Sequence, residues 1–589
     1  MVARSVGSIT TALLLSLPAQ QTPPTIRART TLVPVDVRVV DLNGNPVTDL
    51  KKEDFTVEED GVRQEVRLFE AHALTAETPA PGGPALRREL AADATTGVQT
   101  QRIFLFVFGR GRLQAPEKAI DAAIDFVRGR LLPQDRVAVL AYNRATDFTT
   151  DRAAIVTTLE RFRRSHERVE ADMAQYFSGL RAVYGSRELP DYIQRQVDEI
   201  FNGPGAASAR RLPPGTPTDA RLQAYDVRRG AEALQRAEIL ANRLPGSGVD
   251  TTFDLANAEL AGGSFDEFAN ATLEAGQGLS SIYTAITYLR HLNGEKHIIF
   301  MNERGLFLPR AENDGSVAAL ASDARVVVDT IQTGGVLSMN PLGRPCPTCP
   351  TQVMPERLGR MSSNQLVAEQ AVRNIAGLTG GLSSTTGSPA KLLARIDHSS
   401  RFQYLLGYAP VSATYDGRFR RIRVNVNRRG VQVLHRNGYY ARRELVPVDR
   451  RDFYTTTRIA AAGVYVGDIS DLKVSAAAAF EKGASEVAVD VTLKPDRLNF
   501  EHGGGRHKAS VQMAFFLGDR KEDIVGERWQ LVDLNLTDAS YQEFMMRGAS
   551  YSLPIAVTGE PSLLKVIAYD YAADLIGIAN VSVRVVSVK

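Results

Sequence analysis

Two arginines in a glycine-containing turn have the clearest potential for binding chemistry in this sequence. The turn reads Phe108-Gly109-Arg110-Gly111-Arg112 and follows the apolar run 103–108. A guanidinium group presents its N–H donors in a planar fork that matches a carboxylate. Arg110 and Arg112 could therefore hold an acidic group of a partner. The favoured alternative is that they pair with acids of this chain such as Glu303, or remain solvated.

The cysteines, Cys346 and Cys349, are candidates for a small loop disulfide. They stand in the sequence Cys-Pro-Thr-Cys inside the proline-containing stretch 334–360. A redox-active Cys-x-x-Cys begins a helix that stabilises its thiolate, and the prolines argue against a helix here. Two cysteines are also too few for a four-ligand zinc site. We expect a loop staple rather than a catalytic dithiol.

Motifs of known catalytic machinery are absent from the sequence. It contains no Gly-x-Ser-x-Gly and no His-Glu-x-x-His, and its 8 histidines include no pair at i and i+4. His297 and His435 lie in strand patterns and are expected to be structural. The glycine-rich segment 502–507 lacks the Gly-Lys-Ser/Thr ending of a phosphate loop. We predict that the protein is not an enzyme, with catalytic groups converging from distant positions as the alternative.

Composition and charge indicate a globular chain and select no particular partner. The 589 residues are 44% hydrophobic and 23% charged, and 70 Lys plus Arg against 67 Asp plus Glu leave a net charge of +3. The sequence has no long run of like charges that would indicate binding to a nucleic acid. Residues 1–19, with Arg4 before an uncharged stretch, are expected to be a signal peptide. No later stretch approaches the ~20 apolar residues of a membrane span. We expect a secreted or periplasmic, cell-envelope protein.

The pattern of apolar residues divides the chain into several regions. Residues 30–71 alternate as strands do, and so do residues 418–440, so we expect them to form one β module, with a linker at 72–100. Residues 101–410 alternate between strands and helices. This order predicts an α/β domain with a doubly wound, mostly parallel sheet, whose ligands bind at the carboxyl ends of the strands.

Two further regions complete the organisation. Residues 163–275 have a helical pattern that the α/β domain does not require, and they are expected to be a helical insertion that acts as a lid, a recognition surface or a structural prop. Residues 463–589 contain repeated strands separated by turns. They predict an antiparallel β-sandwich.

Several word-like segments, in this order, are similar to one family. The resemblance is to the von Willebrand factor type A-related proteins described especially from Acidobacteria, and it covers roughly residues 30–445. The segments are Asp135-Arg136-Val137-Ala138-Val139, Gly278-Leu279-Ser280-Ser281-Ile282-Tyr283-Thr284-Ala285-Ile286, Lys296-His297-Ile298-Ile299-Phe300, Ala376-Gly377-Leu378-Thr379-Gly380-Gly381, Tyr404-Leu405-Leu406-Gly407-Tyr408 and Gly438-Tyr439-Tyr440-Ala441.

The resemblance implies a metal-ion-dependent adhesion site that this sequence has lost. Such a site holds Mg²⁺ through an Asp-x-Ser-x-Ser turn, a later Thr and a later Asp. Here Phe108, Arg110 and Arg112 occupy the turn, while Ser280 matches the Thr and Glu303 lies where the later acid is expected. Guanidinium groups repel a cation, so we expect no Mg²⁺ at this position. We also expect no other cofactor.

The function that the resemblance implies is adhesion, protein binding or scaffolding, with recognition of the partner at the top of the type A-like domain. Because the metal-binding residues are replaced, we expect this recognition to be independent of a metal. The candidate partner-binding residues are Arg110, Arg112, Ser280 and Glu303. One alternative is an envelope hydrolase or assembly factor with a site in the helical insertion. Another is residual cation-dependent adhesion through Ser280 and Glu303.

Overall fold

The computed structural model combines helices with several β-sheets, one of which is largely parallel. The described residues are 32–76, 101–115, 117–176, 189–205, 265–290, 292–306, 312–334, 368–385, 388–411, 414–442, 451–465, 469–495, 497–520 and 524–586. The expected signal peptide, both cysteines, residues 77–100 of the expected linker and residues 177–188 and 206–264 of the expected insertion lie outside them.

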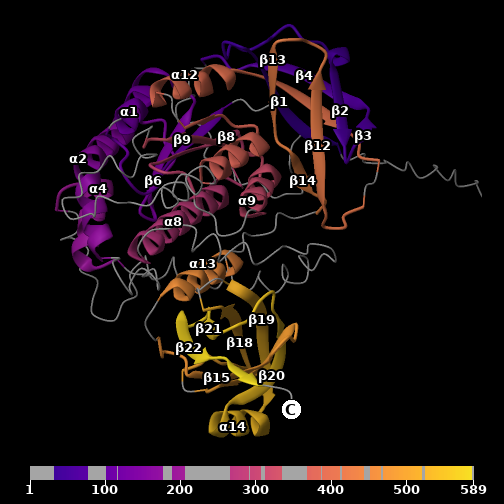
Figure 1. The fold of residues 1–589 in the computed structure, drawn as a ribbon. Coiled ribbons are helices and arrows are strands. Elements are labelled where there is room, and N and C mark those ends of the chain that lie inside the picture. Colours follow the sequence, from indigo (N-terminus) through magenta and orange to yellow (C-terminus); the bar gives the residue numbers. More distant parts are fainter. Residues whose placement is uncertain are drawn as a thin grey trace, which may run out of the picture.

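A six-stranded sheet forms the centre of the α/β part (Figure 1). Its strand order is β10-β9-β8-β5-β6-β7, and every neighbouring pair is parallel except β6 and β7. Strands β5 and β8 are buried along their whole length, which explains why their central residues, 103–108 and 298–301, are continuous apolar stretches rather than alternating patterns. The strands are β5 (Arg102–Phe108), β6 (Arg136–Ala141), β7 (Arg144–Ala145), β8 (Glu295–Asn302), β9 (Val326–Gln332) and β10 (Ser383–Ser384).

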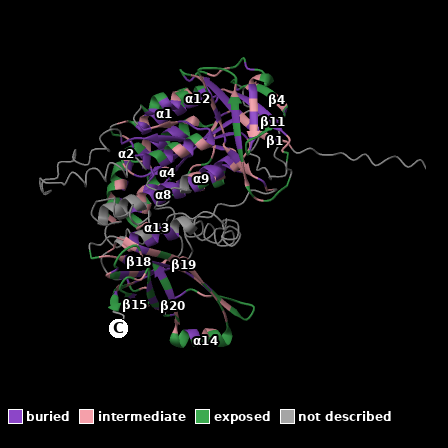
Figure 2. Cartoon of the chain, turned by 45° about the vertical axis from the view of Figure 1, so that its right-hand side comes forward, coloured by how far each residue is buried: buried purple, intermediate pink, exposed green. Residues whose placement is uncertain are grey.

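Helices cover both faces of this sheet. Phe104 and Phe106 of β5 point into a core with α1 (Ala119–Gly129), α2 (Arg152–Tyr176), α4 (Asp191–Asn202) and α12 (Pro389–Ser399). The alternate residues Ile103 and Leu105 face α8 (Phe265–Leu289), α9 (Glu312–Asp323) and a helix that includes residues 368–379. Figure 2 shows buried strands between helices whose outer faces are exposed. Among the described helices, none combines the length and the apolar character that a membrane span requires.

Helix α2 is longer than the sequence pattern suggested. The helical insertion is expected to begin at residue 163, but α2 continues through that position to Tyr176. Val169 and Met173 extend the buried stripe of the helix into the same core, which keeps the added turns on the sheet. Helix α8 likewise begins at Phe265, inside the expected insertion. Both ends of residues 163–275 therefore belong to α2 and α8, which are themselves helices that cover the sheet.

The β module is built from both ends of the α/β part. The two segments join in one module, as expected from their alternating patterns, with β12 paired to β2 and β13 paired to β1. The strands from the N-terminal side are β1 (Val33–Asp41), β2 (Phe55–Glu59), β3 (Val62–Gln64) and β4 (Val66–Ala73). Those from the later side are β11 (Phe402–Tyr408), β12 (Phe419–Val426), β13 (Val431–His435) and β14 (Gly438–Tyr440).

Strand β11 corrects the expected end of the α/β domain at residue 410. It lies between β1 and β4 in the module, not in the parallel sheet. Its alternate residues Tyr404, Leu406 and Tyr408 are buried in the core of the module. The Tyr404 hydroxyl donates to the Val47 carbonyl oxygen at 2.8 Å and accepts from the Leu50 N–H at 3.1 Å. The apolar run of this strand did not reveal which sheet it joins.

A buried ion network joins the start of the central strand to the helix that leads into β11. The Arg102 side chain is fully buried. It contacts Asp135 at 2.5 Å, Asp397 of α12 at 3.0 Å and the Ser400 hydroxyl at 2.8 Å. Burial alone would lower the pKa of Arg102, but the two carboxylates outweigh it and raise that pKa. Arg102 therefore stays charged and holds three segments together.

The C-terminal region consists of two packed β-sheets, whose strand pairs are antiparallel as expected except for the parallel pair of β15 and β23. A four-stranded sheet, β20-β16-β15-β23, packs on the sheet β17-β18-β21-β22, to which β19 adds by pairing with β18. Val489, Phe515 and Val566 lie in the core between them. The strands are β15 (Val474–Glu481), β16 (Glu486–Leu493), β17 (Glu501–Gly503), β18 (Arg506–Gly518), β19 (Ile524–Thr537), β20 (Ala549–Ala556), β21 (Leu563–Asp570), β22 (Leu575–Ser582) and β23 (Arg584–Val586).

Two helices of this region were not anticipated from the sequence. Helix α13 (Arg451–Val464) covers the outer face of the β18–β21–β22 side, with Ile459 and Ala462 packed near Phe516. It lies between α8 and the sandwich (Figure 1). Helix α14 (Asp538–Arg547) follows β19 and is capped by the Thr537 hydroxyl, which accepts from the Ser540 N–H.

Replacing Arg102 with Met tests the buried ion network. The change leaves Asp135 and Asp397 buried without their cation, so the free energy of unfolding should fall by about 3–5 kcal/mol in urea denaturation. Arg128→Met removes an exposed pair with Glu160 and should cost at most about 1 kcal/mol. Equal effects of the two changes would contradict the role given to Arg102.

Candidate functional site

The turn that follows β5 lies at the carboxyl edge of the sheet, against the end of β8. The Gly109 N–H donates to the Met301 carbonyl oxygen at 2.7 Å. Gly111 has a φ of +91°, and a Cβ there would lie 2.6 Å from the Cβ of Glu303. Glycine at this position therefore lets the turn adopt a left-handed conformation and approach β8 closely.

Arg110 points into the protein rather than to solvent. Its side chain is buried, and its Nε lies 2.9 Å from both carboxylate oxygens of Glu170 on α2. Glu170 also accepts from the Gly111 N–H at 2.9 Å, and Gln277 of α8 accepts from Nη1 of Arg110. Burial opposes the charge of Arg110, but Glu170 and Glu274 outweigh it and raise the pKa. Arg110 thus fixes the turn between two helices.

Arg112 forms an ion pair with Glu303 and is the exposed member of that pair. Its Nε donates to Glu303 at 2.7 Å and its backbone N–H donates to the other oxygen of the same carboxylate at 2.9 Å. The Arg112 side chain is 47% exposed, whereas that of Glu303 is 7% exposed. The expected internal pairing with Glu303 is therefore present for Arg112, while Arg110 pairs with Glu170 instead.

The acid at this edge does not offer the ligands that Mg²⁺ requires. Both carboxylate oxygens of Glu303 already accept hydrogen bonds from Arg112. Ser280 is buried in α8, one turn beyond Gln277, and its carbonyl oxygen accepts from the Thr284 hydroxyl. Within the part of the chain that the structure describes, no group of three or more His, Cys, Asp or Glu side chains could hold a metal ion. The residues present do not fit the metal of the type A family.

Sequence reasoning missed the residues of α2 that hold the turn. His166 bonds to the Gly111 carbonyl oxygen at 2.7 Å through Nε2 and to the Tyr142 hydroxyl at 2.5 Å through Nδ1. Burial lowers the pKa of His166, so the ring is neutral, with its proton on Nε2 facing the carbonyl oxygen. Phe162, His166 and Glu170 recur at intervals of four. Extending that helical period beyond Phe162 would have found them.

A small pocket lies beside the turn. Arg110, Glu274, Gly278, Asn302 and Arg304 are among the residues that line it. Burial raises the pKa of Glu274 despite the opposing effect of Arg110, and Glu170 and Glu303 raise it further. The carboxyl edge of the sheet is therefore a dense arrangement of acids and guanidinium groups whose charges largely compensate one another.

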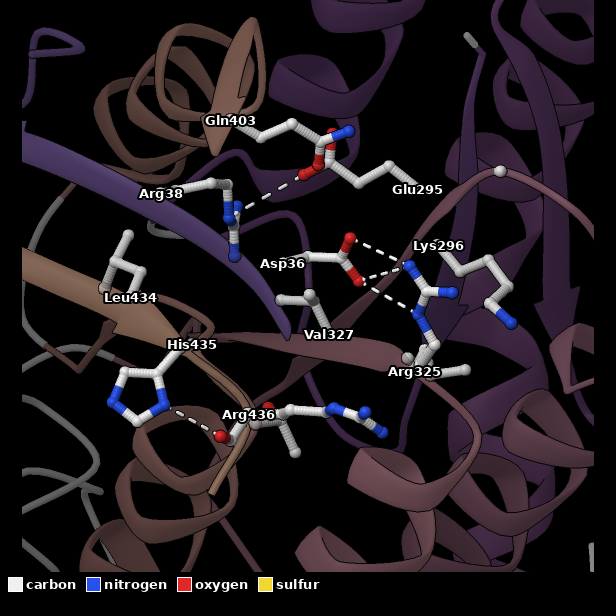
Figure 3. Close-up of a pocket in the computed structure, with 13 residues that line it drawn as sticks. Asp36, Arg38, Glu295, Lys296, Arg325, Val327, Gln403, Leu434, His435 and Arg436 are labelled. Carbon is white, nitrogen blue, oxygen red and sulfur yellow. Dashed lines mark hydrogen bonds and ion pairs between the residues drawn. The ribbon is translucent and has the colours of Figure 1, made fainter. Parts of the chain in front are cut away.

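A second hollow lies at the amino edge of the sheet, against the β module (Figure 3). Asp36 of β1 forms a two-pronged pair with Arg325, with contacts of 2.7–2.9 Å. Arg436, which follows β13, donates to the Ser322 carbonyl oxygen of α9 at 2.9 Å, and Arg38 of β1 donates to the Gly380 carbonyl oxygen at 2.6 Å. Burial would raise the pKa of Asp36, but Arg325 outweighs it and lowers that pKa. These pairs join the module to the sheet.

His297 is enclosed between carboxylates within the sheet. Its Nδ1 lies 2.8 Å from Asp329 of β9, and its Nε2 lies 3.2 Å from Glu295. Burial lowers the pKa of His297, but hydrogen bonds from the protonated ring to the two carboxylates outweigh burial and raise it overall. With both nitrogens bonded inside the sheet, His297 is placed as a structural histidine.

Comparisons with known proteins identify no relative that assigns a family. No family model matches the chain, and no curated protein matches it. The human B7-H4 IgV-like domain is 13% identical to this chain, with a TM-score of 0.12. The match covers 20% of this chain and 99% of the B7-H4 chain. An engineered protein of solved structure is 13% identical, covers 82% of this chain and 93% of that chain, and has a TM-score of 0.11. Scores this low carry no argument about the fold.

Replacing Glu170 with Ala tests how the turn is held. The change removes the acceptor of the Gly111 N–H and the partner of Arg110, so amide exchange in residues 109–112 should accelerate by about tenfold. Hydrogen exchange with mass spectrometry would measure it. Glu167→Ala, at an exposed position of the same helix, is the matched control and should leave the turn protected.

The raised pKa of His297 predicts that local stability falls as the pH rises above about 6.5. The folded-state pKa lies above the unfolded value of about 6.5, so the stabilisation is complete below that value and is lost as pH rises through the folded pKa. Opening free energies of β8 and β9, from hydrogen exchange corrected for intrinsic rates, should fall with pH in the wild type. They should not show this fall in His297→Gln.

Proposed function

We propose that this chain is a non-catalytic binding protein whose six-stranded sheet is the doubly wound core of a von Willebrand factor type A-like domain. The strand order supports this proposal, since β7-β6-β5-β8-β9-β10 is the order 3-2-1-4-5-6 in chain sequence. The two helical faces and the antiparallel edge strand β7 are consistent with it. The segments that resemble the family fall on this framework, for example 278–286 in α8 and 296–300 in β8.

The proposed recognition site is the carboxyl edge of the sheet, at Arg112. The observation that carries this proposal is the asymmetry of its ion pair, because the acid is buried while nearly half of the Arg112 side chain is exposed. Glu303 fixes the backbone and Nε of Arg112, so the guanidinium group is oriented before a partner binds. An acidic side chain of a protein partner matches this surface chemically.

Arg110 has a positioning role in this proposal. Its guanidinium group occupies the space between Glu170 and Gln277, and so it compensates the acids around the turn. A type A domain that retained its metal would use Mg²⁺ for this neutralisation and would bind a partner carboxylate through it. In this chain a buried arginine neutralises the acids and an exposed arginine faces the partner. Recognition therefore needs no metal.

The proposed setting is the cell envelope or the extracellular space, with a protein as the partner. It rests on the signal-peptide pattern of residues 1–19 and on a net charge of +3 without a basic run. The β module and the C-terminal sandwich act in this proposal as scaffolding that displays the α/β part.

A capture experiment with the full chain tests the proposed function. Partners would be pulled down from envelope and secreted fractions in Mg²⁺ and again with a chelator, and their affinities would then be measured by titration calorimetry. Arg112→Ala should weaken the captured partner by about tenfold or more, because it removes a charge-assisted contact. Arg128→Ala, at a 55% exposed arginine that also has an ion-pair partner, should not.

The two conditions separate this proposal from its rival. A partner retained under chelation and weakened by Arg112→Ala supports recognition without a metal. A partner lost under chelation would instead indicate cation-dependent adhesion. If the Arg112→Ala variant bound the partner with unchanged affinity, the binding site would not lie at this edge of the sheet.

A further inference from the structure

The hairpin of β17 and β18 brings two histidines together on the surface of the C-terminal sandwich. His502 and His507 are direct partners in the ladder, and Gly504 and Gly505 form the turn with φ values of +60° and +69°. This is the two-residue type I′ geometry. The pair next to such a turn is hydrogen-bonded, so the histidine pair is the following, non-hydrogen-bonded one, whose side chains approach most closely. Strand pairing thus juxtaposes histidines that are five residues apart.

The two rings face each other through the same kind of nitrogen. Nδ1 of His502 lies 2.5 Å from Nδ1 of His507. The other nitrogen of His507, Nε2, lies 2.7 Å from the Asp538 carboxylate at the start of α14. A carboxylate only accepts hydrogen bonds, so it places the ring proton of neutral His507 on Nε2. The lone pair of Nδ1 is then directed toward His502.

The ring of His507 is held in this orientation from a second side. It stacks on Tyr541 of α14 with a centroid distance of 4.0 Å and an interplanar angle of 10°. The His507 side chain is 17% exposed, whereas His502 is exposed. One ring is therefore fixed by its neighbours, and the other can adjust its position.

We propose that His502 and His507 bind a divalent transition-metal ion such as Zn²⁺, Ni²⁺ or Cu²⁺ through their Nδ1 atoms. Imidazole nitrogen suits these ions, and a carboxylate on the far nitrogen of a ligating histidine is the arrangement that orients such ligands. When His502 carries its proton on Nε2, its Nδ1 lone pair also faces His507, and a cation between the two nitrogens removes their repulsion. Asp538 acts as the outer partner that fixes the tautomer of His507.

The distances allow the ion to enter with a small movement. Metal–nitrogen bonds of about 2.0–2.1 Å place two ligating nitrogens roughly 3 Å apart, so His502 must move outward by less than about 1 Å. Two protein ligands leave the remaining positions to water, which makes this an open, surface site. This proposal does not depend on binding at Arg112, which lies in a different domain.

Titration calorimetry of the full chain with Zn²⁺ alone, without an affinity tag, tests this site. We expect one ion to bind per chain, with Mg²⁺ giving no signal. His502→Gln and His507→Gln should each weaken Zn²⁺ binding by at least about tenfold, and Asp538→Asn by about tenfold through loss of orientation. Thermal unfolding of each variant would show that the exposed hairpin change leaves the sandwich folded.

Two control variants locate the bound ion. His398→Gln removes an exposed histidine of α12 and should leave Zn²⁺ binding unchanged. Cys346→Ser combined with Cys349→Ser should also leave it unchanged. Binding that survives both histidine substitutions, or that disappears with the cysteines, would overturn the proposal. Absence of Zn²⁺ binding to the wild type would also overturn it, and would mean that the two rings share only a proton.

Discussion

The buried guanidinium group of Arg102 is the interaction on which the arrangement of the domains depends. It stands at the first residue of the central strand and bonds to the segment before β6 and to the helix that leads into β11. A charge without solvent is costly unless its donors are satisfied, so Asp135, Asp397 and Ser400 cannot move independently of it. The α/β sheet and the β module are consequently fixed to each other at the place where the chain passes from one to the other.

Arginine performs a related task at the opposite edge of the sheet. Arg110 is buried between α2 and α8, and Arg112 is held against the acid that follows β8. In both places the cation belongs to the chain itself, so its position is set by folding rather than by the concentration of an ion. The arrangement of charge at this edge is therefore permanent. Which charged group is accessible to solvent and to other molecules depends on which side chain of each ion pair is exposed, and not on whether a metal is bound.

Features that depend on local pattern could be predicted from the sequence, and features that depend on distant pairing could not. The apolar stretches within β5 and β8 indicated a covered sheet, and the alternation in β12 and β13 indicated that they join the module of β1 and β2, although not which strand pairs with which. Strand β11 has an equally apolar run, but its sheet is chosen by side chains such as Tyr404 that meet residues far away in the sequence. Glu170 was missed for a related reason, since a charged residue late in a helix identifies its partner only after the helix is placed. Of the candidate site, the Arg112–Glu303 pair could be anticipated, whereas the inward direction of Arg110 could not.

The β module closes around strands from both sides of the α/β part, and this sets an order on how the chain can mature. Strand β1 is synthesised hundreds of residues before its neighbours on both sides, β11 and β13. Until those strands emerge, β1 has two unsatisfied edges that could pair with other chains. The intervening α/β sheet can form in the meantime and bring the ends of the module together, which reduces the entropy lost when the final strands add. A delay in the middle of the chain would thus lengthen the time for which the beginning is vulnerable to aggregation.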